Sequence, residues 1–138
     1  HPFGYEQFEY NTAFLNKLSA VHRTSNVEFF IMTNQAGIAR GLFTESAFKE
    51  DMFAFCDVLE TKFSIPITKF YYCPHHPSIG NPRYRMTCDC RKPSPGMLNK
   101  AIEEFKLDRS QVTFVGDRIT DEKAALSAHL SFNYIKFN

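Results

Sequence analysis

Two short cysteine-containing clips constrain this chain more than any other feature of its sequence. The first is a C-x-H pair, Cys73 and His75, and the second is a C-x-C pair, Cys88 and Cys90. Thiolate and imidazole groups in two such clips, separated by a loop, are typical of a tetrahedral zinc site. Any fold that uses these four ligands together must bring the two clips face to face.

The loop between the clips has few apolar residues with which to order itself. It contains Pro77, Gly80 and Pro82 and only scattered apolar side chains. Ordering a chain costs roughly 1–2 kcal/mol per residue, whereas a structural zinc ion supplies on the order of 10–16 kcal/mol. Because these magnitudes match, we expect zinc to hold the loop 73–90.

Four protein ligands leave no position for a reactive water, so the expected zinc site is structural and not catalytic. The alternatives are disulfides between the clips or free thiols, and disulfides need an oxidising compartment that nothing in the sequence indicates. His76 is an alternative fourth ligand. His75 is preferred because it allows both side chains of its clip to point to one side of an extended segment.

Length and charge limit the class of protein. The 138 residues, 43% of them hydrophobic, can form one domain, 1–138, with a proper core. The net charge of +1 with dispersed basic residues does not favour binding to nucleic acid or to a membrane surface. No apolar run approaches the roughly 20 residues of a membrane span, and no signal-peptide pattern opens the chain. We therefore expect a cytoplasmic monomer.

Strand and helix patterns alternate along the chain after an irregular lead-in over residues 1–10. Apolar runs rich in aromatic and β-branched residues predict strands at 27–32, 67–72, 112–115 and 132–137. Helical spacing of apolar residues predicts helices from Thr12 to about Arg23, after Thr44, after Ser94 and over 120–129. This alternation predicts an α/β, Rossmann-like fold with a mostly parallel sheet and helices on both faces.

Two of the predicted helices have recognisable beginnings. Thr44 is the expected N-cap of a long helix whose apolar stripe consists of Phe48, Met52, Phe55, Leu59 and Phe63. Ser94 is the expected N-cap of the next helix, with Pro95 in its first position.

Polar residues follow the predicted strands where a parallel sheet places ligands. Thr33 follows the first strand, Lys92 precedes a helix, and Asp117 follows the third strand, so these groups can converge at one edge. The Thr33 hydroxyl can donate to phosphate oxygens, and Lys92 can neutralise their charge. Asp117 suits magnesium.

Two neighbouring residues extend this reading. Arg91 offers a fork for a second anionic group. Asp121 is either a helix cap or an outer-shell group of the metal, and we favour the outer shell. Taken singly, each of the strand-end residues has an ordinary explanation as a turn, cap or solvated residue, and only the combination points to phosphate chemistry.

Four ordered motifs carry a resemblance to a known family. They are T-N-Q-A-G-I-A-R-G (33–41), Y-Y-C-P-H-H-P (71–77), C-D-C-R-K-P-S-P-G-M-L (88–98) and V-G-D (115–117). Together they resemble the histidinol-phosphate and heptose-bisphosphate phosphatase branch of the haloacid dehalogenase superfamily. The long zinc loop and its C-P-H-H-P lead-in are most similar to the heptose-bisphosphate phosphatases, and the resemblance spans residues 3–136.

The resemblance implies a magnesium-dependent phosphomonoesterase that works through an aspartyl-phosphate. Thr33 and Lys92 match the residues that hold the phosphoryl group, and Asp117 matches the magnesium ligand. The implied substrate-binding residues are Asn34, Gln35, Ala36, Arg91 and Arg118. Arg118 stands where relatives commonly have lysine, which changes the expected contact. The implied zinc ligands are Cys73, His75, Cys88 and Cys90.

One family motif is missing. The family opens with a strand that ends in D-x-D-G-T and carries the nucleophile and the general acid and base, and no such motif occurs here. Its strand is central in the family's sheet, so its absence would leave buried backbone groups unpaired, at about 1–3 kcal/mol each. We therefore expect that this is a partial chain of an active enzyme.

Several readings of function remain. The first is a sugar-phosphate phosphatase acting on a heptose bisphosphate, and a sister reading has histidinol phosphate as the substrate. A second class is a non-catalytic relative that lacks the nucleophile and binds a phosphorylated ligand or a protein. The third class, a zinc-stabilised nucleic-acid module, is disfavoured by the near-neutral charge.

Overall fold

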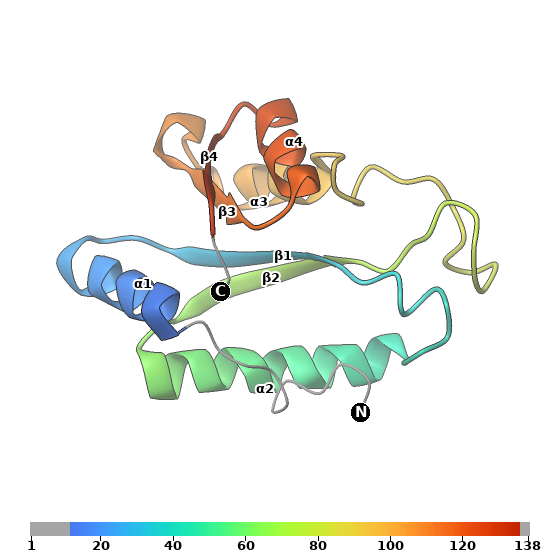
Figure 1. The fold of residues 1–138 in the computed structure, drawn as a ribbon, viewed down its shortest axis with the longest axis horizontal. Helices are drawn as coiled ribbons and strands as arrows, with labels where there is room; N and C mark the ends of the chain where they lie inside the picture. Colours follow the sequence, from blue (N-terminus) through green and yellow to red (C-terminus); the bar gives the residue numbers. More distant parts are fainter. Residues whose placement is uncertain (1–11, 136–138) are drawn as a thin grey trace.

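The computed structural model describes residues 12–135, in which helices and strands alternate (Figure 1). The elements in chain order are α1 (Thr12–Thr24), β1 (Phe29–Asn34), α2 (Glu45–Phe63), β2 (Ile67–Cys73), α3 (Gly96–Phe105), a 3-10 turn (Arg109–Gln111), β3 (Thr113–Gly116), α4 (Ile119–Ser127) and β4 (Ser131–Tyr134). Every predicted helix and strand is present. The predicted lead-in at 1–10 and the end of the last predicted strand, 136–137, lie outside the described residues.

The described strands form two parallel pairs. β1 pairs with β2 from Phe29↔Ile67 to Asn34↔Cys73, and β3 pairs with β4 from Thr113↔Ser131 to Gly116↔Tyr134. The parallel direction confirms the prediction. Within residues 12–135, however, the two pairs are not hydrogen-bonded to each other, so the strands do not form one continuous sheet. Apolar runs identify strands, but they do not say which strands are neighbours.

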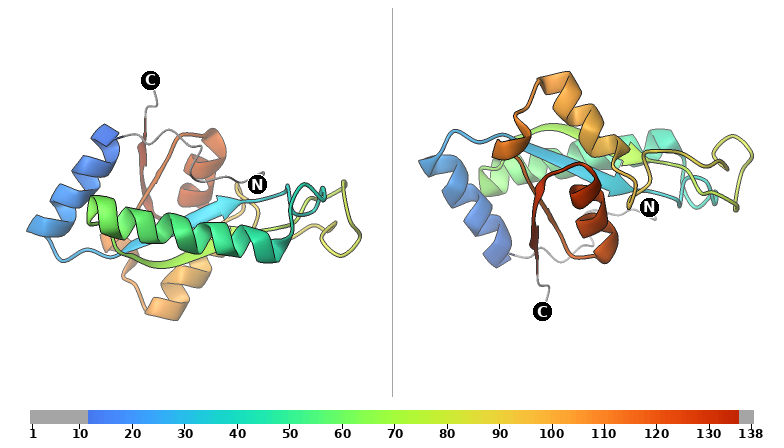
Figure 2. Two further views of the ribbon diagram at one scale, coloured as in Figure 1. Left: turned by 90° about the horizontal axis from the view of Figure 1, so that it is seen from below. Right: turned by 90° about the horizontal axis from the view of Figure 1, so that it is seen from above.

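Helices lie on both sides of the β1–β2 pair, as expected. α2 runs along one side of the pair, and α3 and α4 lie on the other (Figures 1 and 2). The loops that leave β1 and β2 project from the same end of this pair, the carboxyl end of the strands, in all views. The segments 35–44 and 74–92 are thereby placed side by side. A main-chain hydrogen bond joins them, in which the Asn81 N–H donates to the Ala39 carbonyl at 2.7 Å.

Three apolar clusters form the core. On the α2 side, Phe48 and Met52 are buried with Ile38 against the first strand pair. On the other side, Met97 and Ala101 of α3 pack with Tyr71 and Cys73, while the remaining cluster joins α3 to α4 and consists of Leu98, Ile102, Ala124, Ala125, Ala128 and Leu130. Met32 of β1 packs against both of these last clusters, so it links the two strand pairs. Each fully buried large side chain contributes about 1.5–3 kcal/mol.

Helix α2 has the cap and the apolar stripe that its sequence predicts. The Thr44 hydroxyl accepts a hydrogen bond from the Ala47 N–H at 3.1 Å, which confirms the N-cap. Phe48, Met52 and Leu59 of the predicted stripe are buried, and Phe55 and Phe63 are half-buried.

The predicted cap of α3 is wrong by one residue. The N-cap is Pro95, without a side-chain hydrogen bond, and Ser94 lies before it. The helix begins at Gly96, whose N–H donates to the Asp89 carbonyl at 2.8 Å. A Cβ at position 96 would lie 2.2 Å from that oxygen, so only glycine allows this approach. The second cysteine clip, and not a serine side chain, therefore sets the start of α3.

Strand and helix boundaries move by one to two residues from the predicted ones. β1 runs to Asn34, so Thr33 and Asn34 are strand residues opposite Tyr72 and Cys73 and not part of the loop. Helix α4 ends at Ser127, two residues before His129, which has a left-handed φ of 60°. Among the described helices, none combines the length and the apolar character that crossing a bilayer requires.

Candidate metal centre and phosphate-binding site

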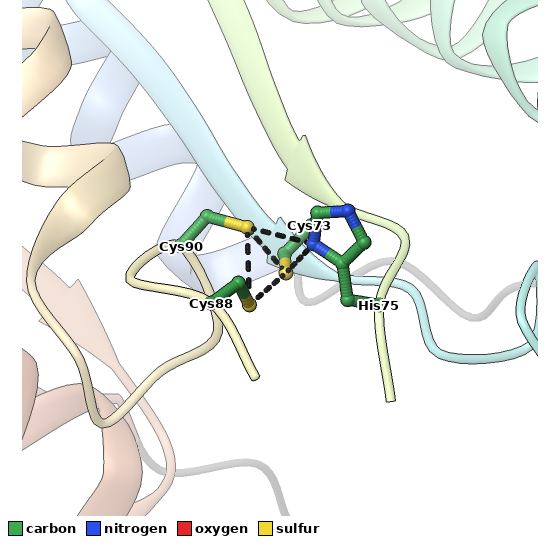
Figure 3. A group of neighbouring side chains, drawn as sticks. All are labelled: Cys73, His75, Cys88 and Cys90. Carbon is green, nitrogen blue, oxygen red and sulfur yellow. Dashed lines mark hydrogen bonds between the residues drawn. The ribbon is translucent and has the colours of Figure 1, made fainter. Parts of the chain in front are cut away.

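The four predicted zinc ligands converge on one point. Their ligand atoms all lie within 4.8 Å of one another, at the carboxyl end of β2 (Figure 3). The Cys73 Sγ lies 3.5 Å from His75 Nδ1 and 3.5 Å from Cys88 Sγ, and Cys90 Sγ lies 3.3 Å from His75 Nδ1 and 3.5 Å from Cys88 Sγ. Around a tetrahedral zinc ion, with bonds of about 2.0–2.3 Å, neighbouring ligand atoms are roughly 3.5–3.8 Å apart. The side chains therefore fit such an ion.

One pair of sulfur atoms is closer than this geometry requires. Cys73 Sγ and Cys90 Sγ are 2.6 Å apart, longer than the roughly 2.05 Å of a disulfide bond. The pair must separate by about 1 Å to bind a tetrahedral ion. None of the four cysteines, Cys56 included, forms a disulfide bond, so the disulfide alternative is not realised.

The two adjacent histidines have different roles. His75 directs Nδ1 at the cysteine sulfurs (Figure 3). His76 uses its own Nδ1 to accept hydrogen bonds from the Ser78 and Ile79 N–H groups at 3.1 and 3.0 Å. His76 therefore caps the turn that opens the loop, and the preference for His75 as the fourth ligand agrees with this arrangement.

The thiols differ in their acidity. Burial raises the pKa of Cys73 and of Cys90. Burial also acts to raise the pKa of Cys88, but hydrogen bonds from the Cys90 and Cys73 thiols and from the backbone outweigh it and lower that pKa. Thiolates are the form that binds metals, and a bound cation offsets the cost of burying their charge.

The loop between the clips is fastened to the rest of the fold by a carboxylate at the start of α2. Glu45 accepts hydrogen bonds from two hydroxyl groups, that of Tyr72 on β2 and that of Tyr84 in the loop, the latter at 3.0 Å. At Gly80, with a φ of +103°, a Cβ would lie 2.1 Å from the Ala39 carbonyl oxygen. The loop is thus packed closely against the segment that follows β1.

Glu45 makes the stability of this loop dependent on pH. The Tyr72 hydroxyl, and after it the Tyr84 hydroxyl, lower the pKa of Glu45 from its usual 4.5. A lowered pKa means that the stabilisation is fully present above about pH 4.5 and is lost as the pH falls through the lower, folded-state value. We expect the urea midpoint of the wild-type protein to exceed that of Glu45→Gln at pH 6.5, and the gap to shrink below pH 4.5. A gap that stays constant from pH 6.5 to pH 3.5 would contradict this role.

Thr33 lies at the carboxyl end of β1 with its hydroxyl oriented by a neighbour. The Gln35 side-chain amide donates to the Thr33 hydroxyl oxygen at 2.9 Å. The oxygen acts as the acceptor in this bond, so the hydroxyl proton remains available for a phosphate oxygen. Gln35 is itself held by its main-chain N–H, which donates to the Cys73 carbonyl at 2.8 Å. Ala36, in the turn that follows, accepts from the Arg40 N–H at 3.0 Å.

Lys92 lies shortly after the loop 73–90 that holds the two clips, called the metal loop below. Its side chain contacts both strand pairs. Its ammonium group forms an ion pair with Asp121 Oδ1 at 2.6 Å and donates to the Met32 carbonyl at 3.4 Å. It also lies over the ring of Phe114, 5.7 Å from the centroid. The Lys92 side chain is 14% exposed and that of Asp121 is 6% exposed, so this pair is largely shielded from water. The ammonium therefore lies beside the carboxyl end of β1 and the first turn of α4.

Asp117 stands in the turn between β3 and α4, where its side chain is exposed. Four residues on, Asp121 Oδ2 accepts a hydrogen bond from the Arg118 N–H at 3.2 Å, so Asp121 caps the start of α4. A Cβ at Gly116 would lie 2.4 Å from the same Oδ2, so a glycine lets the carboxylate approach the end of β3. Asp121 thus links Lys92 to the turn in which Asp117 lies. Asp121 therefore has the capping role that was one of its two expected roles, together with an ion pair that was not predicted.

The other predicted substrate residues are tied to the metal loop. Arg91 Nη1 donates to the His75 carbonyl at 3.1 Å. Asn34 hydrogen-bonds the main chain of Lys92 through both of its polar atoms, at 3.0 and 3.1 Å. A shallow cleft of about 200 Å³ lies beside these groups; its lining residues are Pro77, Met86, Thr87, Cys88, Arg91, Lys92, Pro93 and Ser94.

The contacts of Asn34 and Asp121 with Lys92 were missed because they join residues 58 and 29 positions apart. The only sequence signal is local: Asn34 directly follows Thr33, and Asp121 follows Asp117 by one helical turn.

This chain is similar in sequence to known proteins. Residues 89–134 match the family described as "HAD-hyrolase-like". Over 105 residues the chain is 42% identical to the D-glycero-beta-D-manno-heptose-1,7-bisphosphate 7-phosphatase of Haemophilus influenzae, covering 76% of this chain and 56% of that protein. The D-glycero-alpha-D-manno-heptose-1,7-bisphosphate 7-phosphatase of Campylobacter jejuni is 43% identical over 108 residues, with 76% and 55% covered. The chain belongs to the haloacid dehalogenase superfamily.

A solved structure supports the same assignment and places the chain near the heptose-bisphosphate phosphatase branch. The D,D-heptose 1.7-bisphosphate phosphatase from B. bronchiseptica, complexed with magnesium and phosphate, superimposes with a TM-score of 0.72 at 28% identity, covering 86% of this chain and 61% of that one. The predicted resemblance to this branch is confirmed. The chain spans a little over half the length of the curated relatives it matches.

Proposed function

We propose that the protein containing this chain is a magnesium-dependent phosphatase that removes one phosphate from a heptose 1,7-bisphosphate. The observation that carries the proposal is the position of Lys92, whose ammonium lies beside the carboxyl end of β1 and is paired with Asp121 at the start of α4. Ligands of open α/β sheets bind at this end of the strands. The names of the similar proteins support the sugar bisphosphate as the substrate.

The roles of this chain's own residues follow from their chemistry. Thr33 donates its hydroxyl proton to a phosphoryl oxygen, because its oxygen already accepts from Gln35. Lys92 neutralises the negative charge on the transferred group, and Asp121 holds the ammonium in place before the substrate arrives. Arg91 lines the cleft next to Lys92 and offers its guanidinium group to the second phosphate or to a sugar oxygen.

Magnesium fits the donor set in this region. Asp117 is the residue directly after β3, and its exposed carboxylate is a hard oxygen ligand. When bound, the ion neutralises phosphate charge and orients the phosphoryl group. The nucleophilic aspartate of the family's D-x-D motif has no counterpart in this sequence, so we assign that role to none of these 138 residues.

Zinc is the metal we propose for the cysteine cluster. Three thiolates and one imidazole match its preference for soft and borderline ligands, and the four atoms are close enough to surround one ion. The role we assign is structural: the ion pins the loop that forms one wall of the cleft. The loop then carries Arg91 and Lys92 directly after the ligand Cys90.

Phosphate release by the full-length protein tests this proposal. The protein is incubated with Mg²⁺ and, separately, the alpha and beta anomers of the heptose 1,7-bisphosphate, histidinol phosphate and fructose 1,6-bisphosphate. We expect release from a heptose bisphosphate to exceed release from histidinol phosphate by at least about 100-fold in kcat/KM, and EDTA to abolish it. Preference for histidinol phosphate would favour the sister reading. Absence of release from every compound would favour a non-catalytic relative.

A further inference from the structure

Both polar atoms of the Asn34 side-chain amide form hydrogen bonds with the same residue, Lys92. Its Oδ1 accepts from the Lys92 N–H at 3.0 Å, and its Nδ2 donates to the Lys92 carbonyl at 3.1 Å. The amide thus pairs with the main chain of Lys92 much as a neighbouring β-strand would. Both bonds are partly buried and join residues 58 positions apart.

The position of Asn34 is itself fixed by the pairing of β1 with β2. It is the last residue of β1 and lies opposite Cys73 of β2, and the next N–H, that of Gln35, donates to the Cys73 carbonyl at 2.8 Å. On the other side of Lys92, Cys90 ends the second metal clip. The Lys92 main chain is therefore held between the end of the sheet and the cysteine cluster.

We propose that Asn34 is a positioning residue, which sets the main chain of Lys92 so that its ammonium meets the phosphoryl group, and that it is not a contact to the sugar. This inference rests on the proposed phosphatase function. With the main chain fixed, the Lys92 side chain starts from a defined point and reaches Met32 and Asp121. A displacement of about 1 Å at such a group can lower a rate about 100-fold.

Inorganic phosphate distinguishes the two roles because it has no sugar. In Asn34→Ala, made in the full-length protein with Mg²⁺, we expect calorimetry to show phosphate affinity about tenfold lower, and kcat for the heptose bisphosphate to fall about 100-fold. The KM should rise by no more than the factor lost in phosphate affinity. A raised KM with phosphate affinity within about twofold of the wild type would identify a sugar contact and overturn the inference.

The hydrogen bonds themselves can be tested without turnover. Asn34→Asp has nearly the same shape and keeps an acceptor for the Lys92 N–H, but it lacks the donor to the Lys92 carbonyl. In the full-length protein we expect NMR hydrogen exchange at the Lys92 amide to be at least about tenfold faster in Asn34→Ala and to stay slow in Asn34→Asp. Equal exchange in the wild type and Asn34→Ala overturns the inference.

Failure of the wild type to hydrolyse any sugar phosphate instead overturns the proposed function. The amide-exchange and phosphate-affinity measurements do not depend on turnover, so the two failures can be told apart.

Discussion

Replacing Lys92 by alanine is expected to abolish phosphate release by the full-length protein while leaving its zinc content intact. The ammonium of Lys92 is the positive side-chain charge that lies against the Met32 carbonyl and Asp121, where the phosphoryl group is proposed to bind. Loss of one preorganised charge of this kind lowers kcat by about 10²–10³-fold or more. The checks are initial rates of phosphate release and zinc measured by atomic absorption on the same sample.

Two further variants test whether a loss of activity in Lys92→Ala comes only from a loss of stability. Lys92→Ala leaves the buried Asp121 carboxylate without its partner, which can cost about 3–5 kcal/mol of stability. The double variant Lys92→Ala/Asp121→Asn removes that stranded charge and should recover the thermal midpoint without recovering activity. Lys100→Ala, an exposed lysine on α3, is the matched control and should keep wild-type rates. Full activity in Lys92→Ala would show that another cation serves the phosphate.

Replacing Cys88 by serine is expected to lower both zinc content and stability. Cys88 Sγ lies 3.5 Å from the sulfurs of Cys73 and Cys90, so its loss removes one of four converging ligands. A four-ligand zinc site supplies on the order of 10–16 kcal/mol, and we expect the free energy of unfolding to fall by about 3 kcal/mol or more. Urea unfolding followed by circular dichroism, with zinc quantified in parallel, measures both effects.

Cys56→Ser is the matched control for Cys88. Cys56 is a half-buried free thiol on α2, outside the cluster, and burial raises its pKa to about 11. The same chemical change there should leave zinc content at the wild-type value. Equal zinc content in Cys88→Ser and Cys56→Ser would show that the four side chains do not act together as a metal site.

The sequence was sufficient to predict the helices and strands and the convergence of the four candidate zinc ligands because these depend on local patterns. Aromatic and β-branched runs identified the strands, and the stripe that begins at Phe48 identified α2 together with its Thr44 cap. The two clips identified the cysteine cluster because each spacing, C-x-H and C-x-C, already places two ligands together before the loop folds back.

Tertiary contacts account for what the sequence did not reveal. Ser94 has the usual chemistry of a cap, but the approach of Gly96 to the Asp89 carbonyl sets the start of α3. The division of the described strands into two pairs depends on hydrogen bonds between distant segments, which no local period records. The same holds for Asn34, whose amide meets Lys92 only after the metal loop has folded back.

A crystal structure of the full-length protein with Mg²⁺ and inorganic phosphate tests the convergence of these residues most directly. We predict phosphate at the carboxyl end of β1, with one oxygen within hydrogen-bonding distance of the Thr33 hydroxyl and another within that distance of the Lys92 ammonium, about 2.7–3.2 Å. Asp117 should lie among the ligands of the ion. Phosphate bound at another face, with Thr33 and Lys92 both free of it, would contradict the account.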